Sequence, residues 1–186
     1  MIRVASLAGS LLLAVAVPAQ AADWTMDAEA SRLDFTATFE QAAAPGVFRD
    51  FETRVRLEVD KPAEARLDVT IDVRSADMNS ADVNRAISGP EWFDSARFPR
   101  AEFHATDIRR TDGARYLARG TLSLKGVQRP VEVPFAWTEA REAARMQGEF
   151  IVKRGAFGIG TGEWAATSAI GPDVKITFDV RLRKGG

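Results

Sequence analysis

Apolar and polar residues alternate with a period of two over most of this chain. A strand with one buried face shows this pattern, because successive side chains point to opposite faces of a sheet. Eight such segments follow one another, and a shorter one is present at 24–26. The eight alternating segments are 33–39, 55–59, 67–73, 101–105, 116–124, 131–137, 146–152 and 174–182. The pattern predicts an all-β protein.

Turn-forming residues lie between most of these segments. Glycine or proline clusters occur at 44–46, 60–62, 111–113 and 125–126. Short strands at such regular spacing favour a meandering antiparallel sheet that closes on itself. We therefore expect a lipocalin-like, eight-stranded antiparallel β-barrel that forms one domain over residues 22–186.

One stretch departs from the alternation. Residues 80–87 predict a short helix, with Asn79 or Ser80 as the N-cap and with Val83 and Ile87 on one face.

The first residues are typical of an export signal. Met1-Ile2-Arg3 is a short basic start, an apolar run follows from Val4 to Val17, and Ala19-Gln20-Ala21 is a small-x-small cleavage motif. The alternative is a membrane anchor, but the run is shorter than the roughly 20 residues that a spanning helix needs. We expect a signal peptide over 1–21 that is cleaved near Ala21/Ala22, and a secreted protein that is located in the periplasm.

Composition narrows the classes of function. The formal net charge is −1, and basic and acidic residues are interspersed, which disfavours nucleic-acid binding. The chain has no cysteine and only one histidine, His104. A transition-metal site usually needs several such ligands, so we expect no metal and no cofactor. Serine catalysis would depend on His104 alone as the base, and no Gly-x-Ser-x-Gly motif accompanies it.

The barrel interior can be read in two ways. Small inward residues such as Ala118, Gly120 and Gly148 either leave a cavity or interleave with large rings in a filled core. The 11 phenylalanines against a single tyrosine favour a cavity, and one that suits a hydrocarbon rather than a sugar or nucleotide. Trp137 and Trp164 either line such a cavity or pack against the barrel wall.

Three motifs resemble the YceI-like family of polyisoprenoid-binding proteins. They are Trp92-Phe93-Asp94-Ser95-Ala96-Arg97-Phe98-Pro99, the segment from Gly120 to Val131 with its Leu124-Lys125-Gly126-Val127 turn, and Arg154-Gly155-Ala156-Phe157-Gly158-Ile159-Gly160. The segments 24–35 and 46–51 fit the family in register, so the resemblance covers essentially the whole chain after residue 21. The Gly89-Pro90 pair departs from the family's pattern and would stiffen or reroute the cover of the tunnel.

The resemblance implies non-catalytic binding or transport of a long-chain apolar lipid, such as a quinone or a polyprenyl phosphate, in the barrel tunnel. It places the short helix, Trp92, Phe93 and Phe98 at a cover, and the loop from Arg154 to Ile159 near the mouth. It also allows a homodimer and requires no stable membrane span. The residues expected to contact lipid are Phe35, Phe39, Phe48, Leu67, Val69, Ile71, Ile87, Trp92, Phe93, Phe98, Phe103, Leu122, Phe135, Phe150, Arg154, Phe157, Ile159, Ile176 and Phe178.

Three alternatives remain beside this reading. A small hydrolase or isomerase with the barrel as its substrate pocket would need Glu91, Asp94 or Arg154 to act. A binding module with a filled core would recruit a protein partner. An outer-membrane barrel would need aromatic girdles, which the single tyrosine disfavours. Arg154 itself could bind a lipid phosphate or quinone oxygen, or form a salt bridge with Asp94 or Glu163.

Overall fold

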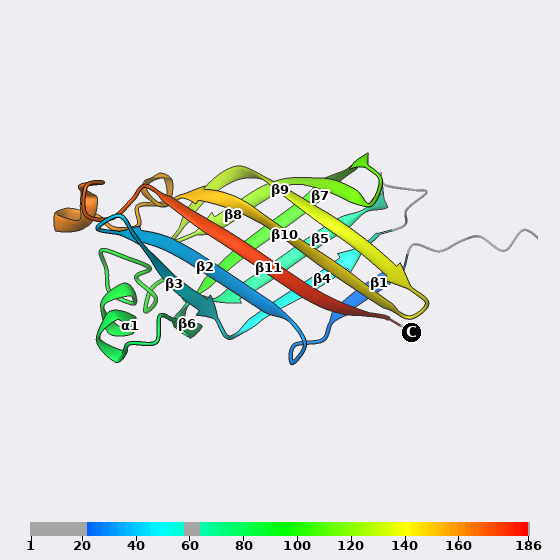
Figure 1. The fold of residues 1–186 in the computed structure, drawn as a ribbon, viewed down its shortest axis with the longest axis horizontal. Coiled ribbons are helices and arrows are strands. Elements are labelled where there is room, and N and C mark those ends of the chain that lie inside the picture. The colour runs from blue at the N-terminus through cyan, green and yellow to red at the C-terminus, as the bar shows by residue number, and fades with distance from the viewer. Residues whose placement is uncertain (1–21, 58–63, 186) are drawn as a thin grey trace, which may run out of the picture.

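The computed structural model describes residues 22–57 and 64–185 and is an antiparallel β-barrel with one helix at one end (Figure 1). The expected signal peptide, with its cleavage site, lies outside the described residues, as do Val59 and the turn expected at 60–62. The strands are β1 (Asp23–Met26), β2 (Arg32–Phe39), β3 (Ala42–Phe48), β4 (Phe51–Arg56), β5 (Arg66–Asp72), β6 (Ala76–Asp77), β7 (Arg100–Asp112), β8 (Arg115–Leu124), β9 (Val127–Ala140), β10 (Ala143–Lys153) and β11 (Asp173–Lys184). The helical segments are η2 (Val73–Ser75), α1 (Ala81–Ile87), η3 (Arg154–Phe157) and η4 (Gly162–Ala165).

The eleven strands of the described residues occupy eight positions around the barrel, because each of three positions is shared by two shorter strands. Strand β11 pairs with β2 through Lys175–Asp179 and with β1 through Leu182–Lys184, so β1 and β2 together occupy one strand position. β3 and β4 share the next position, since β3 pairs with β2 and β4 pairs with β1. β5 and β6 share the third, and the β1–β11 pairing closes the ring. The predicted eight-stranded closed antiparallel barrel is confirmed.

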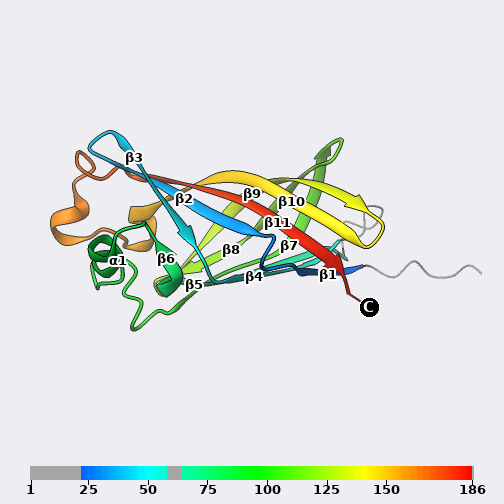
Figure 2. The same ribbon diagram turned by 60° about the horizontal axis from the view of Figure 1, so that its bottom comes forward.

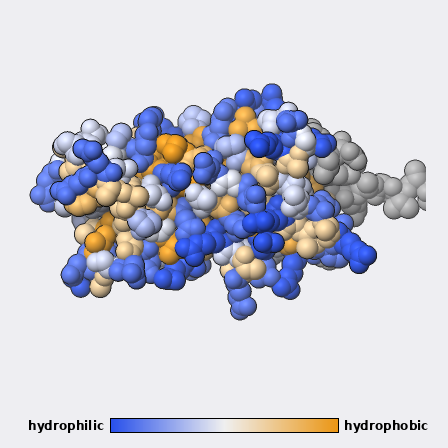
Figure 3. All heavy atoms as spheres, viewed as in Figure 1, coloured by the Kyte–Doolittle hydropathy of each residue, from blue (hydrophilic) through white to orange (hydrophobic). Residues whose placement is uncertain are grey.

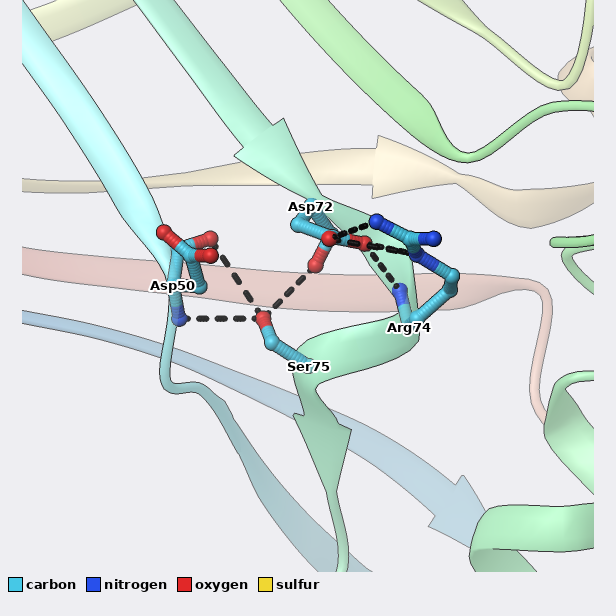
Figure 4. Close-up of polar contacts among 4 residues, drawn as sticks. All are labelled: Asp50, Asp72, Arg74 and Ser75. Atoms are coloured by element: carbon cyan, nitrogen blue, oxygen red, sulfur yellow. Dashed lines mark hydrogen bonds and ion pairs between the residues drawn. The ribbon is translucent and has the colours of Figure 1, made fainter.

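Hydrogen bonds stabilise the bend at η2, which separates β5 from β6 (Figure 4). The Ser75 hydroxyl donates to the carbonyl oxygen of Asp72 at 2.6 Å and accepts from the backbone N–H of Asp50 at 3.0 Å. The Asp72 carboxylate accepts from the backbone N–H of Arg74 at 2.9 Å and also binds the Arg74 guanidinium. The chain thus bends through η2 while the start of β4 stays attached to the bend.

The strand alternation divides the side chains as predicted. Inward residues of β7, such as Ala101, Phe103 and Ala105, are buried, whereas His104 points outward and binds Asp68 on β5. The face seen in Figure 3 is mostly hydrophilic, with small separate hydrophobic areas.

The turns are only partly those that the sequence predicts. Lys125-Gly126 and the Gly113 turn lie between strands, with positive φ at Lys125 (49°), Gly126 (74°) and Gly113 (49°). The prediction of a turn at 44–46 is wrong, because these residues belong to β3 and pair with β2. The hairpin instead turns at Glu40-Gln41, which take φ values of 46° and 66°.

The wall between β9 and β10 is paired over only part of its length. Its ladder runs from Ala143↔Ala140 to Gln147↔Ala136 and stops there, although β10 pairs with β11 as far as Lys153. The N–H of Trp137 donates to Ala114 on the β8 side, so the even-numbered residues of β9 face β10. Pro130 and Pro134 are both even-numbered and have no N–H to donate. We call this unpaired stretch, residues 128–134 of β9 and 149–153 of β10, the seam.

Candidate functional site: an apolar cavity at one end of the barrel

One half of the barrel interior is filled. Trp24 and Trp137 pack edge to face with ring centroids 5.5 Å apart, and Tyr116 stacks on Phe135 at the same separation. All four side chains are buried. This half lies away from α1, and it matches the filled-core reading of the sequence.

The other half contains a cavity of 440 Å³, a volume within the usual range for a small-molecule site. Strands β2, β3, β5, β7, β8, β10 and β11 form its wall, and α1 and the segment containing η4 lie at its open end (Figures 1 and 2). Phe39 and Val83 line the cavity and are also 44% and 40% exposed, which places the mouth between the β2–β3 hairpin and α1. Its lining is almost wholly carbon, so it suits a hydrocarbon rather than a polar metabolite.

Many of the expected lipid contacts do line this cavity. They are Phe35, Phe39, Phe48, Ile71, Ile87, Trp92, Phe93, Leu122, Phe150, Arg154, Ile159 and Ile176. They come from six strands, from α1 and from the two loops that the sequence motifs identify. Whether they touch a ligand stays a prediction.

The remaining expected contacts lie outside the cavity wall. Leu67, Phe103, Phe135, Phe157 and Phe178 are buried in the packed core, and Val69 is partly buried against it. Phe98 packs on the β8–β9 turn, where a methyl group on Gly126 would lie 2.8 Å from its ring. These side chains are apolar and inward or sheltered, but they lie beside or below the cavity and are not part of its lining.

The wall also contains residues outside the expected set of contacts, although the sequence left open that Trp164 lines the cavity. The additional lining residues are Leu33, Ala37, Thr38, Ala44, Met78, Val83, Ala86, Ala101, Leu124, Val152, Trp164, Ile170 and Val174. Several follow the same inward alternation as the predicted ones, and Val83 shares the helix face of Ile87. Met78 and Ile170 lie in connecting segments, where alternation carries no signal.

Helix α1 is fixed over the cavity by Asp77 and Asn84. The helix begins after Ser80, whose hydroxyl accepts from the Val83 N–H at 3.4 Å, as one of the predicted N-caps requires. The Asn84 amide donates to Asp77 at 2.9 Å and accepts from the Met78 N–H at 2.8 Å. Hydrogen bonds from Asn84, Arg49 and the backbone of Asn79 lower the pKa of Asp77 to about 2.

Arg154 organises the loop on the opposite side of the mouth. Its guanidinium is buried and donates five hydrogen bonds, all to backbone carbonyls. The acceptors are Gly171 at 2.9 Å, Ile159 at 3.0 Å, Gly160 at 2.8 Å, Trp164 at 2.9 Å and Ile170 at 2.9 Å. An arginine side chain has five N–H donors, so none remains for a ligand.

The salt bridges considered for Arg154 are not formed. Asp94 instead pairs with Arg97 at 3.4 Å, and the Arg154 guanidinium donates to backbone carbonyls only. Burial lowers the pKa of the Arg154 guanidinium, but arginine stays protonated in proteins. The cation is therefore stabilised by carbonyl dipoles.

A second cation, which is only partly buried, joins the segments around the mouth. The Lys125 ammonium group donates to the carbonyl oxygens of Pro90 and Gly158, both at 2.7 Å. The carbonyl of Glu91 accepts from the N–H groups of Gly160 at 2.7 Å and Thr161 at 3.0 Å. The Gly89-Pro90 stretch thus lies against the loop that Arg154 holds.

The three residues that catalysis would require do not gather in the cavity. Of Glu91, Asp94 and Arg154, only Arg154 lines the cavity, and its donors are used as described. No group of three or more histidine, aspartate or glutamate side chains with metal-binding geometry occurs in the described part of the chain. No helix among residues 22–57 and 64–185 is long and apolar enough to cross a membrane.

A closed antiparallel barrel with a ligand-sized apolar cavity at one end defines a class of small-molecule-binding barrels. Residues 24–182 match the YceI-like domain, so the chain belongs to the YceI-like family. The resemblance seen in the sequence motifs is confirmed.

Individual relatives agree with this assignment. The chain is 31% identical over 126 residues to the UPF0312 protein Ent638_1570 of an Enterobacter species, covering 66% of this chain and 65% of that protein. It is 33% identical over 86 residues to the UPF0312 protein plu2095 of Photorhabdus laumondii, covering 46% of this chain and 44% of the relative. The chain thus spans between about two fifths and two thirds of the length of the curated relatives it matches.

Solved structures share the fold. BcnA of Burkholderia cenocepacia superposes with a TM-score of 0.81 at 30% identity, over 84% of this chain and 98% of that one. A polyisoprenoid-binding domain from Saccharophagus degradans, implicated in plant cell wall breakdown, superposes with a TM-score of 0.70 at 16% identity, over 87% of this chain and 98% of that domain. The second likeness establishes a common barrel and nothing further.

Proposed function

We propose that this protein binds the hydrocarbon chain of a lipid, of the polyisoprenoid class, in the apolar cavity and performs no chemistry on it. The observation that carries the proposal is the cavity of 440 Å³ with its carbon lining and exposed apolar mouth. Family membership and the polyisoprenoid-binding domain of similar fold support the choice of ligand class.

The energetics of an apolar chain favour such a site. Burying a methylene group away from water contributes about 0.8 kcal/mol, and this gain needs no directional bond. A hydrocarbon chain in the cavity would contact Phe35, Phe150 and Ile176 on the barrel strands. Selectivity then depends on the length and girth of the chain more than on its functional groups.

The polar end of the ligand stays outside the cavity in this proposal. Arg154 is the only charged side chain on the lining of the described cavity, and all its donors are bonded to carbonyls. A phosphate drawn into the cavity would be desolvated without a partner, which is costly. The head group would therefore remain near Phe39 and Val83 at the mouth, where water solvates it.

We propose further that the protein is exported and acts in the periplasm as a carrier or reservoir. The support is the basic start, the apolar run and the Ala19-Gln20-Ala21 motif. Amino-terminal sequencing of protein from the periplasmic fraction should begin at Ala22. Recovery of a chain that retains Met1 to Ala21 would contradict export with cleavage.

Lipid binding is tested by extracting protein purified from its native compartment with organic solvent and analysing the extract by mass spectrometry. We expect a prenyl lipid at close to one molecule per barrel. A variant with Ala37→Trp narrows the cavity from its wall and should lose the lipid, whereas Ala140→Trp, at the exposed end of β9, should retain it. Absence of any hydrocarbon from the wild-type extract in repeated preparations would contradict the proposal.

A further inference from the structure

The cavity ends at one layer of inward side chains. Moving away from the mouth, Ile176 on β11 and Ala101 on β7 line the cavity, and the next inward residues on these strands do not. Those next residues are Phe178 and Phe103, which are only 7% and 8% exposed. The same step on β10 and β8 leads from the lining residues Phe150 and Leu122 to glycines.

The two phenylalanine rings fill the space that these glycines leave. A methyl group on Gly148 would lie 2.7 Å from Cζ of Phe178, its partner across the β10–β11 ladder. A methyl group on Gly120 would lie 2.8 Å from Cε2 of Phe103 on the neighbouring strand. Real Cβ atoms do not approach so closely, so each ring lies directly over a glycine and closes the barrel at this level.

The interior beyond the two rings contains large buried side chains. Below them Met146 is buried between the strands, and Trp24 packs against Trp137. Phe103 and Phe178 therefore separate an open half of the barrel from a filled half, and the cavity is blind.

We propose that Phe103 and Phe178 form a floor that limits how many isoprene units of a chain can insert. The proposal rests on the lipid-binding function proposed above and specifies it. The cavity of 440 Å³ is closed at this layer, so only the isoprene units above the two rings lie inside the barrel. A longer isoprenoid would leave its remaining units outside the mouth.

A competition between chain lengths tests the floor. Prenyl alcohols of three, four and eight isoprene units are offered as an equimolar mixture in micelles of one nonionic detergent, and the protein-bound fraction is extracted and measured by mass spectrometry. Units that leave the micelle without entering the cavity lose their apolar surroundings. We expect at least about tenfold enrichment of the three-unit over the eight-unit alcohol.

Variants of the floor should change this ratio. Phe178→Ala and Phe103→Ala open space toward the filled half and should shift the ratio toward the longer alcohols by at least about fivefold. Phe178→Leu and Phe103→Leu are milder and should shift it in the same direction if either alanine variant fails to fold. The matched control is Phe135→Ala, which removes a ring of the same size in the filled half and outside the cavity lining. It should leave the ratio unchanged.

The outcomes separate the two proposals. Binding of none of the alcohols by the wild-type protein would overturn the proposed function. Binding of the three-unit and eight-unit alcohols in equal amounts would overturn the floor while lipid binding stands. A shift in Phe135→Ala equal to that in Phe178→Ala would also overturn the assignment of the floor to these residues.

Discussion

The Nη2 atom of Arg154 lies 2.9 Å from the carbonyl oxygen of Ile170, sixteen residues further along the chain. Ile170 in turn forms an isolated β-bridge with Phe39 at the tip of the β2–β3 hairpin. One buried cation therefore connects the end of β10 to the mouth of the cavity through a segment that has little regular structure of its own.

Replacing this cation should destabilise the protein strongly. Arg154→Met leaves carbonyl groups without donors in a buried position, and we expect a loss of about 3 kcal/mol or more in the free energy of unfolding. Arg154→Lys has three donors and should lose less. Urea unfolding measures both. Arg97→Met removes an exposed partner of Asp94 and should cost at most about 1 kcal/mol; an equal loss in the two methionine variants would contradict the assigned role of Arg154.

Gly46 should not tolerate a side chain while Phe35 is present. A methyl group at residue 46 would lie 2.2 Å from Cζ of Phe35, so Gly46→Ala forces the ring to move and should cost about 1–3 kcal/mol. The double variant Phe35→Leu/Gly46→Ala should be less destabilised than the sum of its single changes. Gly155→Ala meets nothing within 4 Å and serves as the control. Additive losses in thermal or urea unfolding would show that the ring does not fill this space.

The stabilisation that Asp77 provides by anchoring helix α1 should be lost in acid. Hydrogen bonds lower the pKa of Asp77 to about 2 from a usual 3.8, so its ionised form is favoured in the folded state. A depressed folded pKa stabilises the protein above the unfolded pKa, and this contribution is lost as the pH falls from about 4 toward 2.

Urea unfolding of wild type and Asp77→Asn at several pH values measures this contribution. The two proteins should differ in stability at neutral pH and converge below pH 4. Asp82→Asn changes a carboxylate on the same helix whose side chain is 91% exposed, and it should alter stability little. A wild-type advantage over Asp77→Asn that persists undiminished to pH 2 would contradict the prediction.

The seam should be visible in amide hydrogen exchange. The N–H groups of Arg145 and Gln147 face β9 within its ladder, whereas those of Glu149 and Ile151 face β9 beyond its end. We expect the second pair to exchange at least about 100-fold faster than the first. Phe150 and Val152 face β11 and should be protected, which provides an internal control. Uniform protection from 145 to 152 would mean that β9 and β10 stay paired in solution.

The sequence predicts the barrel well because alternation reports directly which side chains are inward. The turn at 44–46 is misplaced because Pro45 and Gly46 are turn formers in general, but here Gly46 is needed to admit the Phe35 ring. The real turn uses Glu40 and Gln41 at positive φ, and neither residue type signals it.

The extent of the cavity could not be predicted in the same way. A small inward residue leaves space inside the barrel. The sequence does not show whether an aromatic ring from the next strand fills that space. Filling depends on register: Gly148 is opposite Phe178 and is covered, whereas Ala37 lines the cavity. The sequence alternatives of a hollow and a filled interior both hold, each in one half of the barrel.

The seam also bears on whether copies of this barrel can aggregate by strand addition. An unpaired strand edge is a template on which a strand of another molecule can add, and long apolar edges aggregate. On β9 the prolines at 130 and 134 withhold the donors that an added strand would need. On β10 the exposed Ile151 stands between Glu149 and Lys153, so an incoming strand would meet alternating charges. The residues of the seam would therefore disfavour the addition of a strand from another molecule.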